Sequence, residues 1–274
     1  MYQPGRFFHA CNGMIRGKFL GGPESYNLRV EEGQKAASLI ENAAKELGAD
    51  RVLAPNPGST NRFCDVDGPG LYSLRLNGRD IFRSVEPADA GIARDNKTAI
   101  MFSNADCWLG IVLDPKSNWW SLVHLSGECL TQRKTVLHRV VTAAPVRPKG
   151  LVFLAGFGIG RCCYGYDQRS PKLDRWRHFY PSAVGGYVTT GPRTGQTAVD
   201  IFTAVKIVVE EIGFGQVFFF NTCTACFQHP VLGGRAFHSN TYDQAGSGGP
   251  RNCLIAVRSY CGELPIPLEE LGRN

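Results

Sequence analysis

The residues with the clearest chemical potential are a cysteine and a histidine on two neighbouring apolar segments. Cys107 directly precedes residues 108–113, and His124 lies near the end of residues 119–125. Both segments are rich in aliphatic and aromatic residues and are bounded by turn-forming residues, a pattern typical of strands. We therefore expect the two segments to form an antiparallel hairpin.

The spacing of this hairpin sets which residues face each other. A turn centred on residues 116–117 places Cys107 opposite Ser126 and His124 opposite Leu109. Side chains on a strand alternate between its two faces, so Cys107 and His124 become diagonal neighbours on one face. Their Cβ atoms are then roughly 7 Å apart, a gap that long side chains bridge.

A thiol and an imidazole at this distance suit two kinds of chemistry. They can jointly bind a metal such as zinc, at about 2.0–2.3 Å from the sulfur and nitrogen atoms. Alternatively, they form a thiolate–imidazolium pair with Cys107 as nucleophile and His124 as base, oriented by Asp106 or by a main-chain oxygen. A buried cysteine and a core histidine on an ordinary hairpin are the structural alternative.

Motifs along most of the chain extend this interpretation. Residues 104–107 (Asn-Ala-Asp-Cys) and 123–124 (Val-His) are similar to T-A-D-C and V-H-A-G-W-R-G. Residues 158–164 (Gly-Ile-Gly-Arg-Cys-Cys-Tyr) are similar to C-I-G-P-C-C-Y-E, residues 21–28 to G-x-Y-x-S-L-N-L, and residues 221–224 to N-x-x-C-T. In order and spacing the chain resembles the YfiH-type laccase-domain family, also called multicopper polyphenol oxidases, peptidoglycan editing factors and purine nucleoside phosphorylases.

The resemblance implies one α/β domain over residues 1–274, related in fold to deamidases that use a Cys-His pair. It implies a site in which two histidines and one cysteine bind a metal, usually zinc, beside a pocket for purine nucleosides. Phosphorolysis and deamination of adenosine are the implied activities, so transferase and hydrolase chemistry both remain open.

Only some residues of the family's motifs are present in this chain. Cys107 and His124 match two of the three metal ligands, but Gly58 stands where the first histidine is expected. Glu128 replaces an arginine after His124, and residues 239–242 lack the family's paired arginines. Because phosphate recognition needs multidentate donors or a nest of backbone N–H groups, these changes weaken the phosphorylase interpretation.

A substitute ligand would restore a metal site. Cys64, six residues after Gly58, is the preferred candidate, with Cys129 as the other. Without metal, the same pair is a thiol hydrolase or amidase, and a homologue that only binds its ligand is a third interpretation. Copper is disfavoured, since a multicopper centre needs about ten ligands, mostly histidines, and the chain has 6 histidines.

Further residues are candidates by position within the motifs. Substrate binding is predicted for Asn27, Arg16, Arg161 and Cys162. The pair Cys223 and Cys226 has the spacing of half a zinc site, but a closed site needs two more ligands and only His229 follows closely.

The elements that must position these residues alternate irregularly between helix and strand. Apolar spacing predicts helices over residues 33–47 and 197–212 and a hairpin over residues 74–82. Further strands are expected at residues 51–54, 99–102, 151–155 and 217–220, and long loops at residues 181–195 and 233–250. We therefore predict a layered α/β fold with a mixed sheet.

Charge and composition indicate which classes of binding partner to expect. The formal net charge of +6 on 274 residues is mild and scattered, which favours a small anionic substrate over nucleic acid. The chain has no export signal and no run of about 18 apolar residues, so we expect a cytoplasmic protein without membrane contact. In that setting the 10 cysteines are expected to be thiols.

Overall fold

The computed structural model describes residues 7–11, 13–20, 33–76, 79–228, 237, 239, 241 and 251–259. Its first sheet has seven strands in the order β1-β2-β16-β8-β3-β6-β5. These strands are β1 (Phe7–Ala10), β2 (Ile15–Leu20), β16 (Asn252–Arg258), β8 (Thr98–Asn104), β3 (Arg51–Leu53), β6 (Arg79–Ser84) and β5 (Leu71–Leu76). β3 runs parallel to both of its neighbours and the other pairs are antiparallel, so the sheet is mixed.

The second sheet has six strands in the order β15-β11-β9-β10-β7-β4. They are β15 (Gln216–Cys223), β11 (Val152–Gly158), β9 (Trp108–Leu113), β10 (Trp120–Leu125), β7 (Ala90–Ala93) and β4 (Phe63–Asp65). β11 and β15 are parallel neighbours, as are β4 and β7. The expected layered α/β fold is confirmed, although two large mixed sheets are present where one was expected.

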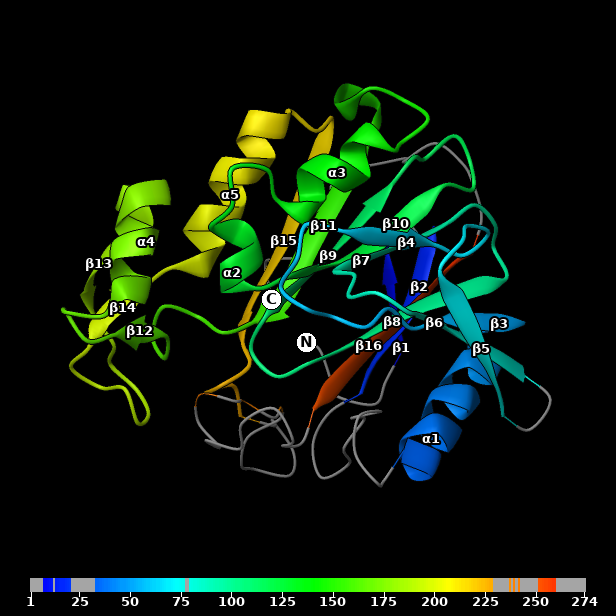
Figure 1. The fold of residues 1–274 in the computed structure, drawn as a ribbon, viewed down its shortest axis with the longest axis horizontal. Helices are drawn as coiled ribbons and strands as arrows, with labels where there is room; N and C mark the ends of the chain where they lie inside the picture. Colours follow the sequence, from blue (N-terminus) through cyan, green and yellow to red (C-terminus); the bar gives the residue numbers. More distant parts are fainter. Residues whose placement is uncertain are drawn as a thin grey trace.

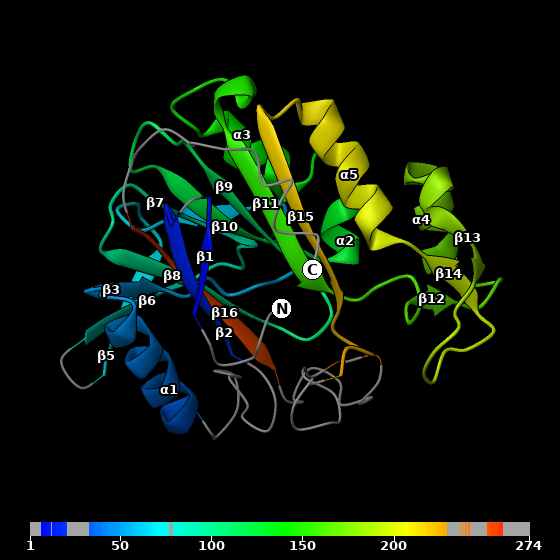
Figure 2. The same ribbon diagram turned by 180° about the vertical axis from the view of Figure 1, so that it is seen from behind.

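The two sheets pack face to face between helices (Figures 1 and 2). Phe19 and Ile100 of the first sheet share a buried cluster with Leu109 and Leu154 of the second. Helix α1 (Gly33–Glu46) covers the outer face of the first sheet. The outer face of the second sheet is covered by α2 (Gly127–Leu130), α3 (Val136–Thr142) and α5 (Ile201–Ile212). Apolar residues therefore fill three separate layers of core.

A small third sheet stands beside these layers. It contains β12 (Gly165–Tyr166), β14 (Thr197–Val199) and β13 (Val184–Tyr187), and lies near α4 (Pro171–Phe179). The expected loop at residues 181–195 is therefore partly wrong, because it begins with a 3-10 turn (Pro181–Ala183) and continues into β13. Most of the second expected loop, residues 233–250, lies outside the described residues.

Most element predictions agree with the structure. The hairpin over residues 74–82 is present as β5 and β6, although its turn at residues 77–78 is outside the described residues. The helix predicted from residue 197 instead starts after Asp200, whose side chain accepts a hydrogen bond from the Thr203 N–H and caps α5. No helix in the described part of the chain is long and apolar enough to cross a membrane.

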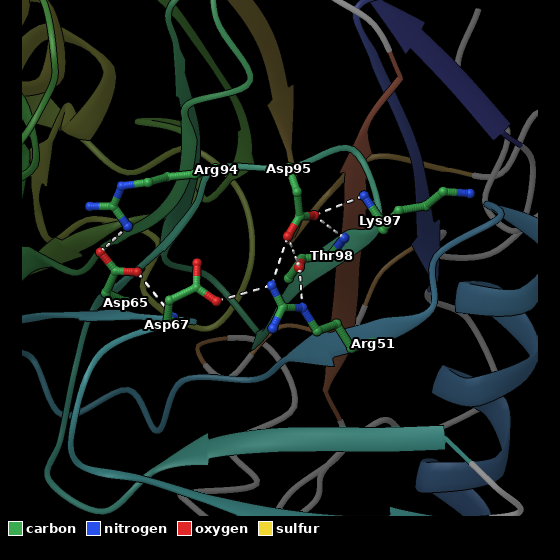
Figure 3. A network of polar contacts seen from close by, with 7 residues as sticks. All are labelled: Arg51, Asp65, Asp67, Arg94, Asp95, Lys97 and Thr98. Carbon is green, nitrogen blue, oxygen red and sulfur yellow. Dashed lines mark hydrogen bonds and ion pairs between the residues drawn. The ribbon is translucent and has the colours of Figure 1, made fainter.

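A network of charged side chains joins the two large sheets at one edge (Figure 3). Arg51 of β3 contacts Asp95 at 2.8 Å, in the turn from β7 to β8, and Asp67 at 3.1 Å, just after β4. Its Nε also donates to the Thr98 hydroxyl at 2.8 Å. One guanidinium thus holds the ends of strands from both sheets, including β7, the strand that follows Asp89.

Replacing this guanidinium tests its contribution to stability. We expect Arg51→Met to lower the free energy of unfolding by about 1–3 kcal/mol, because a partly buried carboxylate loses its charged donor. The measurement is urea unfolding. Arg62→Met removes a long, largely exposed ion pair with Glu86 and is the matched control, with an expected loss below about 0.5 kcal/mol. Equal losses in both variants would contradict this assignment.

Candidate active site

The strands β9 and β10 form the hairpin that carries the cysteine and the histidine. His124 pairs with Leu109, which is the predicted register, and Leu125 pairs with Trp108. The Cys107 and His124 side chains line the same pocket, and Cys107 is a hydrogen-bonding and electrostatic partner of His124. Cys107 is partly exposed, whereas His124 is buried. The hairpin therefore brings the two groups together at an accessible site.

The imidazole is held on its other side by a carboxylate that the sequence analysis missed. His124 Nδ1 and Asp89 Oδ1 are 2.7 Å apart, and the backbone N–H of His124 donates to the Asp89 carbonyl, also at 2.7 Å. Phe102 stacks on the imidazole with a ring-centroid distance of 5.7 Å. With Nδ1 directed at Asp89, the other ring nitrogen is left for Cys107. Cys107, His124 and Asp89 form the arrangement of a thiol catalytic triad.

The charges of this triad follow from its contacts. Burial alone would lower the pKa of His124, but the neighbouring Cys107 and Asp89 outweigh it and raise this pKa to about 10. Burial alone would raise the pKa of Asp89, but His124 and the hydrogen bonds from Thr60 lower it. At neutral pH the histidine is therefore an imidazolium facing a carboxylate. The imidazolium therefore lies between the Asp89 carboxylate and the Cys107 sulfur.

Asp106, the predicted orienting residue, has other partners. Its carboxylate accepts hydrogen bonds from the Thr241 backbone N–H at 2.7 Å and the Thr224 hydroxyl at 3.3 Å. Burial is the main cause that raises its pKa. Asp106 lines the pocket, but Asp89 occupies the orienting position because β7 pairs with β10. Asp106 instead anchors the turn that presents Cys107.

The pocket around the triad has a volume of about 340 Å³ and contains several cationic side chains. Lys172 from α4, Arg193 from the segment before β14, and Arg251 all line it. Arg193 lies over the rings of Tyr164 and Tyr166, 5.6 and 5.5 Å from their centroids. The pocket therefore carries positive charge. Glu128, at the position where the family resemblance implies an arginine, is exposed and does not line the pocket.

The predicted substrate-binding residues do not gather there. Arg161 donates to the Gly185 carbonyl at 2.6 Å on the surface, and Arg16 lies in β2, paired with His9 and Val257. Cys162 belongs to a separate group of thiols. None of these three lines the pocket, and Asn27 lies outside the described residues. The pocket cations come from distant segments without a recognisable motif, so residue patterns alone did not single them out.

The donor set around Cys107 does not fit the metal site that the family resemblance implies. A Cβ added at Gly58 would lie 2.4 Å from Pro87 Cβ, so the present backbone leaves no room for a histidine there. The Cys64 sulfur lies 3.6 Å from the Ala90 carbonyl oxygen, as its hydrogen-bonding partner. Among the described residues, Cys107, His124 and Cys64 do not belong to a group of three or more side chains close enough together to bind one metal ion. Cys129, the other candidate, is buried and absent from such a group.

A different group of ligands does come together. Cys162, Cys163, Cys223 and Cys226, here called the four-cysteine cluster, place their sulfur atoms within 4.8 Å of one another. This is a group that can hold a metal ion. The sequence analysis identified only the second half of it, because the first half lies about sixty residues earlier in the chain.

Comparison with known proteins places the chain in a family. Residues 7–245 match the model of a family described as multi-copper polyphenol oxidoreductase laccase, which spans most of the chain. The chain belongs to this family. The expected YfiH-type relationship is therefore confirmed, and a comparison with curated proteins finds no match.

Solved structures of this laccase-like family have the same fold. YlmD from Geobacillus stearothermophilus is 18% identical with a TM-score of 0.67, over 94% of this chain and 98% of its own. A Bacillus licheniformis hypothetical protein, YfiH, is 17% identical with a TM-score of 0.67, covering 89% and 92%. A Neisseria meningitidis DUF152 protein is 17% identical with a TM-score of 0.66, covering 90% and 95%. At these identities the likeness establishes the fold.

The raised pKa of His124 makes stability depend on pH. Its pKa is about 10 in the folded protein and 6.5 as the ordinary value, so the native state binds the proton more tightly. The stabilisation is fully present below pH 6.5 and is lost as the pH rises through about 10. We expect the difference in unfolding free energy between wild type and His124→Gln to shrink from pH 6 to pH 10 in urea titrations. A difference that grows with pH would contradict the charged pair.

Proposed function

We propose that this member of the laccase-like family is a hydrolase that uses Cys107 as a nucleophile against an amide- or amidine-type carbon. The observation that carries the proposal is the contact chain from Asp89 through His124 to Cys107 inside a pocket. Such a chain supplies a nucleophile, an acid–base group and an orienting carboxylate without a metal. The misfit of Gly58 and Cys64 to a metal site supports the same choice.

The chemical steps balance with these residues alone. The Cys107 sulfur bonds to the substrate carbon while the electron pair of the C=N or C=O bond moves to the heteroatom. As that pair returns, the bond to the amino group breaks, and His124 donates the proton with which ammonia or an amine leaves. His124 then takes a proton from water as the oxygen attacks the same carbon. The C–S bond breaks, which restores the thiolate and the imidazolium.

Adenosine is the substrate to test first. Its amino-bearing ring carbon is an amidine carbon, and the family resemblance implies deamination of purine nucleosides. A volume of about 340 Å³ is in the range of small-molecule sites. The aromatic rings of Tyr164 and Tyr166 line the same pocket and suit a planar base such as that of adenosine.

Phosphorolysis of a purine nucleoside is the second candidate. The observation that favours it is the convergence of Lys172, Arg193 and Arg251 on the pocket of Cys107. Guanidinium groups bind phosphate oxygens through two parallel hydrogen bonds, and lysine adds a point charge. In this reaction phosphate takes the sugar and releases the free base, so the products separate it from deamination.

Substitutions in the triad test the hydrolase. We expect Cys107→Ala to abolish ammonia release from adenosine or from model amides, and Asp89→Asn to lower kcat by about 10²–10⁴-fold through loss of the imidazolium and its orientation. The matched control is Cys64→Ala, which should retain wild-type kcat. Activity lost with Cys64 would instead support a metal ligand there. Saturable nucleoside binding without any turnover would overturn the hydrolase in favour of a ligand-binding homologue.

Phosphate dependence tests the second candidate. With phosphate as co-substrate, we expect Lys172→Met to raise the KM for phosphate by about tenfold, because a single charge contact is worth roughly 1–2 kcal/mol. Arg177→Met is the control on the same helix, since Arg177 pairs with Asp174 outside the pocket lining. Chromatography identifies the product. Absence of free base and of sugar phosphate in the presence of phosphate, with inosine as the only product, would rule out phosphorolysis.

A further inference from the structure

The four-cysteine cluster lies where two neighbouring parallel strands end. Gly158, at the end of β11, pairs with Cys223, at the end of β15. Cys162 and Cys163 follow in the turn after β11, and Cys226 follows in the turn after β15. Two sequence motifs more than fifty residues apart thus project their sulfur atoms into one space.

The spacing of the sulfur atoms suits a single tetrahedral ion. With zinc–sulfur distances of about 2.3 Å, tetrahedral geometry places ligand sulfurs about 3.8 Å apart. All four sulfur atoms here lie within 4.8 Å of one another. We propose that the four-cysteine cluster binds one zinc ion as a closed structural site, distinct from the Cys107 pocket.

Backbone donors around the cluster support thiolate ligands. The Gly160 N–H donates to the Cys223 sulfur at 3.2 Å, and the backbone N–H groups of Ala225 and Cys226 also hydrogen-bond it. Such second-shell donors offset the negative charge of metal-bound sulfur. A Cβ at Gly160 would lie 3.3 Å from the Cys162 sulfur and 3.4 Å from the Cys223 sulfur. The glycine therefore lets the backbone approach both sulfur atoms.

Other uses of four thiols fit the geometry less well. The Cys162 and Cys226 sulfur atoms are 3.5 Å apart, well beyond a disulfide bond of about 2.05 Å. A polynuclear iron–sulfur cluster separates its cysteine sulfurs further, because several metal atoms lie between them. Four sulfur ligands in a tetrahedron are typical of zinc, whereas Cu(II) favours square-planar nitrogen and oxygen ligands.

The ion would fix the turns that support the catalytic pocket. Thr224, next to Cys223, donates to the Asp106 carboxylate, and the Ile159 N–H donates to the Asp106 carbonyl at 2.8 Å. Tyr164, next to Cys163, lines the pocket. A zinc ion joining the two turns therefore holds the residue before the nucleophile and one wall of the pocket.

Metal analysis of the full chain tests the proposal. Protein purified without chelator, or reduced and reloaded with Zn²⁺, should contain about one zinc per chain. Cobalt-substituted wild type should show the absorption bands of a tetrahedral cobalt–thiolate site. Cys223→Ser should lower the zinc content by threefold or more, and a chelator should lower the Tm of wild type.

Cys107→Ser is the matched control, because it removes a thiol of the other site and should keep about one zinc per chain. This control also separates the present proposal from the proposed hydrolase, whose activity it removes. If Cys223→Ser fails to fold, the metal content and the cobalt spectrum of the wild-type protein decide whether the four-cysteine cluster binds zinc. Reloaded wild type with less than about a tenth of an equivalent of zinc, a disulfide between Cys162 and Cys226, or bound iron or copper instead would overturn the proposal.

Discussion

The paired contact between His124 and Asp89 is the constraint on which the site depends. Asp89 is fully buried, and a buried carboxylate is costly unless it is paired and hydrogen-bonded. The imidazolium of His124 supplies the counter-charge, and the 2.7 Å bond between their backbones fixes their separation. Since the ring cannot turn without breaking the carboxylate contact, its remaining nitrogen is directed away from Asp89. The position of Cys107, directly before the adjoining strand β9, then decides which group faces that nitrogen.

The second oxygen of the same carboxylate binds the backbone of the segment around Gly58. Asp89 Oδ2 accepts hydrogen bonds from the N–H groups of Gly58 at 3.2 Å and Thr60 at 2.5 Å. This close approach draws the segment against Pro87 and leaves no space for a larger side chain at residue 58. At the position where the family resemblance implies the first histidine, backbone N–H groups therefore donate hydrogen bonds to the Asp89 carboxylate.

Local patterns predicted the part of the site that lies on one hairpin. The register that pairs His124 with Leu109 follows from alternation and turn position, and both are read directly from contiguous residues. Asp89 was missed because it is 35 residues from His124 and is brought there by the pairing of β7 with β10. Lys172 and Arg193 were missed for a similar reason, since they come from segments whose residues carry no local signal. The predicted half of the site lies on one hairpin. The other half depends on long-range strand pairing, which single-sequence patterns do not specify.

The parallel pairing of β11 and β15 brings together the two turns that carry the four-cysteine cluster. Parallel strands end at the same side of a sheet, so the turns after Gly158 and Cys223 must share the space beyond it. One turn carries Cys162 and Cys163 and continues into the pocket residue Tyr164, while the other carries Thr224, which contacts Asp106. Both turns are irregular, and one backbone hydrogen bond, from the Thr224 N–H to the Gly158 carbonyl at 3.1 Å, joins them. The two turns also meet through the four cysteine sulfurs, which all lie within 4.8 Å of one another. A change in the separation of these sulfurs would therefore reach Asp106, the residue before Cys107, through the Thr224 hydroxyl.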